Sequence, residues 1–94
     1  MKNLSTPHHF YHVYILKSEK DGNLYIGITP NLIKRLEQHN NGKVKSTKYR
    51  RPLLLVYYES YRSFEDAKQR ERKLKYFKNS YKELKARISH SLKI

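Results

Sequence analysis

The pair Asp21-Gly22 constrains the fold most, because it lies between two short apolar runs. Residues Phe10 to Leu16 are rich in β-branched and aromatic side chains, and Leu24 to Ile28 forms a second run of this kind. Two such runs on either side of an Asp-Gly turn predict a β-hairpin. We therefore expect the rest of the chain to pack around an antiparallel pair of strands.

The segment after the hairpin predicts a helix. Thr29-Pro30 is typical of a helix start, with Thr as the cap and Pro at the first helical position. Asn41-Gly42 is typical of a helix end. The inner apolar stripe of this helix is expected at Leu32, Ile33 and Leu36.

Residues 53–88 predict a third strand and two more helices. Leu53 to Tyr58 is an apolar run that follows a proline. Ser63 and Asp66 have the spacing of a capping box, which opens a helix that Asn79-Ser80 interrupts. Tyr81 to Ile88 predicts a second, shorter helix. The predicted order is β-β-α-β-α-α, an α+β fold with a three-stranded antiparallel sheet flanked by helices.

The 94 residues suit one domain, which we place at residues 10–90, after a flexible leader of residues 1–9 and before a tail of residues 91–94. The sequence contains no cysteine, which excludes disulfides, zinc ribbons and thiol nucleophiles and fits a reducing cytoplasm. No apolar run approaches the roughly 20 residues of a membrane span, so we expect no membrane partner.

The charge indicates a polyanionic partner. Lys and Arg number 21 against 8 Asp and Glu, for a net charge of +13, which favours nucleic acid. We expect residues 43–51 to form an exposed loop whose cations hold phosphates while a ring stacks on a base, with phosphate hydrogen bonds from Ser46 and Thr47. The proposed contacts are Lys43, Lys45, Lys48, Tyr49, Arg50 and Arg51. The alternative is a basic surface that binds nothing specific.

Glu71 lies where the apolar seam of its helix requires an apolar residue. The seam runs through Phe64, Ala67 and Leu74, and Glu71 fills the position between the last two. A buried carboxylate is unfavourable unless it is paired or bound to metal. Glu71 is therefore either half of a structural ion pair or part of a site. The basic residues around it, including Lys68 and Lys75, extend the positive field or form a solvated helix face.

Five further residues have the chemistry and placement of a site. Tyr14 and Tyr25 lie in the two strands of one hairpin, so they can approach each other. Gly27 lets a ligand backbone come close or breaks the pleat. Arg35 and His39 are four residues apart and therefore share one helix face.

Together these residues resemble the GIY-YIG nuclease superfamily, over about residues 10–90, and are most similar to its small bacterial members. The matching elements are His12-Val13-Tyr14, Tyr25-Ile26-Gly27, Thr29, Arg35, His39 and the spacing from Ala67 to Glu71. His12 stands where the family name has Gly. Many catalytic members also carry an Asn beyond the Glu helix, and the spacing of Asn79 does not match it.

The resemblance implies phosphodiester hydrolysis with one divalent metal, Mg²⁺ or Mn²⁺. Glu71 would be the only protein ligand of the metal, and Arg35 would hold the phosphate. Tyr14 or Tyr25 would help to generate the attacking hydroxide, with Tyr14 preferred. A phenol with a pKa of about 10 needs a nearby cation for this role. His39 would relay the proton.

The expected function is a metal-dependent endonuclease that acts on DNA rather than RNA and recognises structure more than sequence. A non-catalytic nucleic-acid-binding module with the same fold is the alternative, and a protein-interaction adaptor is a third hypothesis. Each residue also has an ordinary structural interpretation. The tyrosines suit a half-buried strand, Arg35 can pair with Glu37 or Glu71, and His39 suits a helix end.

Overall fold

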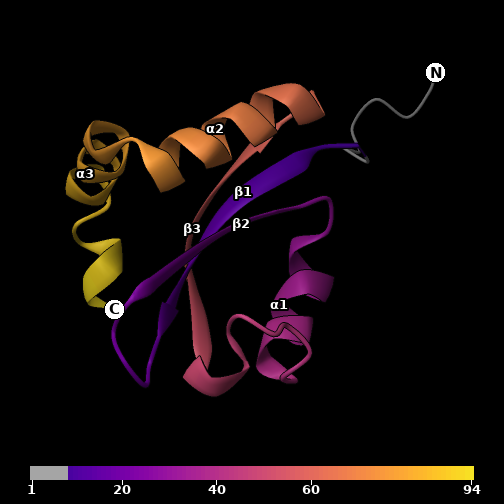
Figure 1. The fold of residues 1–94 in the computed structure, drawn as a ribbon, viewed down its shortest axis with the longest axis vertical. Coiled ribbons are helices and arrows are strands. Elements are labelled where there is room, and N and C mark those ends of the chain that lie inside the picture. Colours follow the sequence, from indigo (N-terminus) through magenta and orange to yellow (C-terminus); the bar gives the residue numbers. More distant parts are fainter. Residues whose placement is uncertain (1–8) are drawn as a thin grey trace.

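Strand β1 is the centre of a three-stranded antiparallel sheet with the order β2-β1-β3. The computed structural model describes residues 9–94, so the predicted leader lies outside the described residues apart from His9. The predicted order β-β-α-β-α-α and the α+β class are confirmed (Figure 1). The elements are β1 (Tyr11–Ser18), β2 (Leu24–Thr29), α1 (Leu32–Asn40), the 3₁₀ helix η1 (Lys48–Arg50), β3 (Leu53–Tyr61), α2 (Phe64–Tyr76), α3 (Lys78–Arg87) and the 3₁₀ helix η2 (Ser91–Lys93).

Helices cover both faces of the sheet (Figure 1). On one face, Val13 and Ile15 pack with apolar residues of α2, α3 and the segment just after α3; these are Ala67, Leu74, Leu84 and Ile88. On the other face, Tyr14, Leu16 and Leu53 pack with Leu32 and Leu36 of α1. Burying a large apolar side chain contributes about 1.5–3 kcal/mol. Successive residues of β1 therefore build two separate cores.

Helix α1 starts later than its sequence predicts. The cap is Asn31, whose Oδ1 accepts a hydrogen bond from Lys34 N at 3.1 Å, whereas Thr29 is the last residue of β2. The prediction that Ile33 faces inward is also wrong, because its side chain is 76% exposed. The fully buried residue of α1 is His39, so a polar ring takes the third inner position.

The break between α2 and α3 falls at Phe77 and not at Asn79-Ser80. Phe77 has an extended backbone, with φ −116° and ψ 110°, and serves as both the last cap of α2 and the first cap of α3. Asn79 and Ser80 lie inside α3. The predicted tail also has structure, since Leu92 in η2 packs against the core and its carbonyl accepts from Lys17 Nζ at 2.7 Å.

Across the part of the chain that the structure describes, we find no helix with the length and apolar character needed to cross a membrane.

Candidate active site

The hydroxyl of Tyr14 lies at the centre of the candidate site. Tyr14 is 2% exposed on β1, and its Oη lies 2.9 Å from Nε2 of His39. Arg35 Nε donates to the same oxygen at 3.4 Å, and Arg35 Nη1 donates to Gln38 Oε1 at 3.0 Å. The four-residue spacing of Arg35 and His39 thus brings both side chains to one tyrosine, as their shared helix face predicts.

Tyr25 borders this group, and Gly27 makes room for it. The ring of Tyr25 lies 5.1 Å from the His39 ring and 6.3 Å from the Tyr14 ring, measured between centroids. Gly27 is the partner of Tyr14 across the β1–β2 pair. A Cβ at residue 27 would lie 2.4 Å from both Cζ and Oη of Tyr14. The structure therefore gives this glycine a packing reason, which is the space that the Tyr14 ring occupies.

Thr47 belongs to the same network, although the sequence interpretation placed it on an exposed loop. Its side chain is fully buried, and its Oγ1 lies 2.8 Å from His39 Nδ1. The expected phosphate hydrogen bond from Thr47 is therefore wrong. Val44 is buried as well, and Thr47 N donates to its carbonyl. The signal available in the sequence was Val44, an apolar residue in a basic segment, which indicates that part of this segment packs inward.

The contacts of His39 suit the tautomer that carries its proton on Nδ1. In this tautomer Tyr14 Oη accepts from Arg35 and donates to Nε2 of His39, and Nδ1–H donates to Thr47 Oγ1. Burial and the positive charge of Arg35 lower the pKa of His39 to about 4. His39 is therefore neutral near pH 7, so its Nε2 can accept a hydrogen bond from the Tyr14 hydroxyl, but the lowered pKa makes it a weaker base than a free imidazole.

Tyr14 keeps its proton in this state. Burial raises the pKa of Tyr14, and the hydrogen bond from Arg35 reverses only part of that effect. The negative charge of Glu71 adds a smaller upward contribution to the pKa of Tyr14. No hydrogen bond links Glu71 to Tyr14, Tyr25, Arg35 or His39 within residues 9–94.

Glu71 faces inward from α2, as its place in the apolar seam predicts. The residue is 4% exposed, and the buried residues of α2 are Ala67, Glu71 and Leu74. Its Oε1 accepts from Lys68 Nζ and its Oε2 accepts from Lys75 Nζ, both at 3.1 Å. Burial raises the pKa of Glu71, but the two lysines together lower it by more. The pKa therefore lies below its ordinary value. The carboxylate is therefore ionised at neutral pH.

The donor set fits a divalent ion held by one carboxylate. The described residues contain no group of three or more His, Cys, Asp or Glu that could enclose a metal. Both oxygens of Glu71 already bind positive charge in the structure. Mg²⁺ commonly binds through one or two carboxylates and takes its other ligands from water and phosphate. Such an ion is compatible with Glu71 alone.

A cavity of about 400 Å³ opens beside Arg35, between the end of β2 and the start of α1. Its lining includes Thr29, Lys34, Arg35 and Gln38. Two cationic side chains and polar groups around an open cavity suit an anionic group such as a phosphate.

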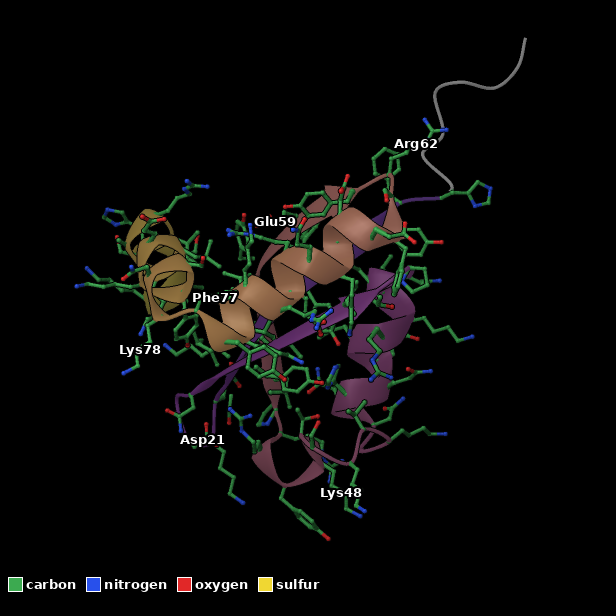
Figure 2. All side chains as sticks on the ribbon, turned by 45° about the horizontal axis from the view of Figure 1, so that its top comes forward. Asp21, Lys48, Glu59, Arg62, Phe77 and Lys78 are labelled. Carbon is green, nitrogen blue, oxygen red and sulfur yellow. The ribbon has the colours of Figure 1, made fainter. Side chains whose placement is uncertain are left out.

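The basic segment 43–51 is more ordered than a simple loop. Arg50 Nε pairs with Asp21 of the hairpin turn at 2.9 Å, and Arg50 O accepts from Ser18 Oγ at 2.6 Å. Figure 2 shows Asp21 and Lys48 toward the same end of the molecule. Tyr49 is 75% exposed, and Lys48 Nζ lies 5.0 Å from the centre of its ring.

These contacts divide the predicted nucleic-acid contacts into two groups. Lys43, Lys45, Tyr49 and Arg51 are exposed, whereas Lys48 and Arg50 are half-buried. Arg51 Nε donates to Lys48 O, and Arg50 is held by its carboxylate partner. The exposed group can reach a ligand without breaking an ion pair, whereas Arg50 fixes the segment to the hairpin.

Comparison with known proteins points to one family. A family model described as the GIY-YIG catalytic domain matches residues 10–85. A UPF0213 protein of Staphylococcus haemolyticus is 45% identical over 73 residues, which cover 77% of this chain and 88% of that protein. The UPF0213 protein YazA of Bacillus subtilis is 40% identical over 82 residues, which cover 86% and 80%.

One solved structure shows the same arrangement. The solution NMR structure of a UPF0213 protein from Bacillus halodurans aligns with a TM-score of 0.53 and 32% identity, covering 84% of each chain. The motif residues, the order of the elements and these relatives all support the same family assignment. The chain therefore belongs to the GIY-YIG catalytic domain family.

Proposed function

We propose that this protein is a metal-dependent endonuclease that hydrolyses phosphodiester bonds in DNA and recognises the structure of its substrate more than its sequence. The observation that carries the proposal is the Tyr14 hydroxyl, which contacts both the Arg35 guanidinium and the His39 ring. Hydrolysis of a phosphodiester uses a cation that binds the phosphate and a neutral group that accepts a proton, and here one phenol contacts both.

Arg35 would hold the phosphate. Its Nε and Nη1 are directed to Tyr14 and Gln38, which fixes the plane of the guanidinium and leaves Nη2 for a phosphate oxygen. Lys34 lines the same cavity and adds positive charge. The exposed cations of segment 43–51 would contact the backbone without reading the bases.

Tyr14 and His39 would form a proton relay. A water gives a proton to Tyr14 Oη while the Tyr14 proton passes to His39 Nε2, and the resulting hydroxide attacks phosphorus. The bond from phosphorus to the leaving oxygen then breaks, the leaving oxygen takes a proton from water, and His39 returns its proton to the solvent. Tyr14 is preferred over Tyr25 because the Tyr25 hydroxyl has no hydrogen-bond partner within residues 9–94, whereas Tyr14 contacts His39 directly. Thr47 would keep His39 in the accepting tautomer.

Glu71 would hold the divalent ion, Mg²⁺ or Mn²⁺. When bound, the ion supplies positive charge to the phosphate and the leaving oxygen. The contribution of the chain is an ionised, inward-facing carboxylate whose charge reaches the Tyr14 hydroxyl.

Cleavage of labelled DNA in Mg²⁺ tests the proposal. Single-stranded, branched and fully paired DNA are compared with RNA of the same sequence, using the wild type, Arg35→Ala and Tyr14→Phe. Glu83→Gln is a suitable control, because Glu83 is exposed on α3. We expect the control to cut as the wild type does and both site variants to lose activity. Equal cleavage by all four proteins would contradict the proposal.

A non-catalytic nucleic-acid-binding module is the second candidate, and the ion pairs of Glu71 favour it. Lys68 and Lys75 satisfy both carboxylate oxygens without a metal. This function predicts salt-sensitive binding of DNA, no cleavage by the wild type, and weaker binding when Lys43, Lys45 and Arg51 are neutralised.

A further inference from the structure

Glu71 is held from both sides along its own helix. Lys68 lies three residues before it and Lys75 four residues after it, and each Nζ contacts a different oxygen of the carboxylate. Spacings of three and four place side chains on one face of a helix. The two ammonium groups therefore take up the carboxylate oxygens that a metal ion would need.

We propose that Lys68 and Lys75 form a latch on Glu71 and that a divalent ion binds by displacing both lysines. The latch is defined as Lys68, Glu71 and Lys75. This inference rests on the proposed function, since it takes Glu71 as the metal ligand, and it adds how access to that ligand is controlled.

The exposures of the three side chains indicate which part moves. The Glu71 side chain is 6% exposed, whereas those of Lys68 and Lys75 are 46% and 37% exposed. A lysine with a solvated end can rotate into water with little loss of contacts, because its long stem is flexible. The carboxylate is fixed by the packing of α2 on the sheet. We therefore expect the lysines to leave and the carboxylate to stay.

Charge makes the competition strong. A divalent ion on Glu71 would lie close to any ammonium group that remained at the same carboxylate, and like charges at such distances repel. The latch holds the carboxylate ionised in the absence of metal, but it lowers the affinity for the ion. An ordinary pair of helix-surface ion pairs would have no such effect on metal binding.

Binding of Mn²⁺ tests the latch without measuring cleavage. Free Mn²⁺ is measured by electron paramagnetic resonance during titration of the wild type, the latch variant Lys68→Gln/Lys75→Gln and the control variant Lys73→Gln/Lys78→Gln. Lys73 and Lys78 are exposed on the same helix and the next one, and they form no ion pair within the described residues. Figure 2 shows Lys78 at the start of α3. Both double variants lose the same charge, so their long-range fields are matched.

We expect the latch variant to bind Mn²⁺ about tenfold more tightly than the wild type, because two competing charges are removed from a partly solvated site. The control variant should stay within about twofold of the wild type, since its lysines are farther from the carboxylate. Adding Glu71→Gln to the latch variant should abolish the gained affinity. Equal affinity in the latch variant and the control variant would overturn the latch.

A second outcome separates the latch from the metal site. If Glu71→Gln weakens Mn²⁺ binding but the latch variant binds like the control variant, Glu71 is the ligand and the latch is wrong. If Glu71→Gln leaves Mn²⁺ binding unchanged, both the latch and the metal role of Glu71 are wrong.

Thermal unfolding gives an independent readout. Without metal, the latch variant should melt below the control variant, because Glu71 is left buried without a partner. Mn²⁺ should then raise the melting temperature of the latch variant more than that of the wild type. An equal rise in both proteins would contradict the latch.

Discussion

The carboxylates of Glu59 and Glu71 both lie between the sheet and α2, but their partners differ. Glu59 on β3 accepts hydrogen bonds from Tyr57 at 2.8 Å, from Tyr61, and from Arg70 Nε at 3.0 Å. Figure 2 shows Glu59 beside α2, which supplies Arg70. Two tyrosine hydroxyls and a planar guanidinium therefore hold this carboxylate. Glu71 lies on the same helix as Arg70, and among the described residues its carboxylate pairs with two lysines.

The pKa shifts of the two carboxylates have the same direction, so it is their partners that distinguish them. Burial raises the pKa of Glu59, but its tyrosine and arginine partners together lower it by more. The net shift is downward, as it is for Glu71. Arg70 is 24% exposed, but Lys68 and Lys75 are 46% and 37% exposed. Glu59 therefore joins β3 to α2, whereas Glu71 is paired with two more exposed lysines of its own helix.

The largest difference is expected in activity. Glu71→Gln should lower DNA cleavage in Mg²⁺ by at least about a hundredfold, because the amide is a poor ligand for a hard cation. The Glu59→Gln variant should cleave DNA at nearly the wild-type rate at temperatures below the melting temperature of the variant. Both rates are measured on the same labelled DNA. Similar losses in the two variants would remove the functional difference between the carboxylates.

The next effect is on stability and runs the other way. Glu59→Gln should lower the free energy of unfolding by about 2 kcal/mol, since it leaves Arg70 without its charged partner. Glu71→Gln should lower it by less than about 1 kcal/mol, because exposed lysines can turn to water. Urea unfolding followed by circular dichroism measures both values. A larger loss for Glu71→Gln would reverse the comparison.

Acid should remove the contribution of Glu59. Its pKa in the folded protein is lowered, so its stabilisation is present above the unfolded pKa of about 4.3 and is lost as the pH falls through the folded pKa. The stability difference between the wild type and Glu59→Gln should therefore shrink as the pH falls below about 4. Urea unfolding at pH 7 and at successively lower pH checks this, and a constant difference would contradict it.

The smallest expected effect on stability comes from giving Glu59 a lysine partner, as Glu71 has. Arg70→Lys keeps the charge but replaces the planar guanidinium with a flexible ammonium group, so we expect a loss of about 0.5–1 kcal/mol. Lys73→Arg, on the exposed face of α2, is a matched control and should change stability little. Equal values for the two variants would show that partner rigidity contributes nothing measurable.

The sequence predicted the parts of this structure that depend on short-range patterns. The Asp21-Gly22 turn, the order of elements and the inward placement of Glu71 are confirmed. The break at Phe77 was missed because an extended backbone at one residue has no composition signal, whereas Asn79-Ser80 had a misleading one. Propensity placed this helix boundary, and the packing of α3 overrode it.

The site could be predicted only in part for a related reason. Tyr14, Arg35 and His39 follow from strand pairing and helix spacing, which are periodic. Thr47 reaches His39 through an irregular segment, so no period places it there. The lysines on Glu71 were visible as charges, but which of the many basic residues of α2 turn inward depends on side-chain rotamers that the sequence does not specify.

Strand β2 lies at the edge of the sheet, and this position has a consequence for control of the protein. Within residues 9–94 it pairs only with β1, yet it carries Tyr25 and the Gly27 that accommodates the Tyr14 ring. Edge strands open locally at lower free energy than central ones. Opening of β2 would separate the tyrosines while the rest of the sheet stays folded. We therefore expect mild heating or denaturant to reduce activity at the candidate site before the whole protein unfolds.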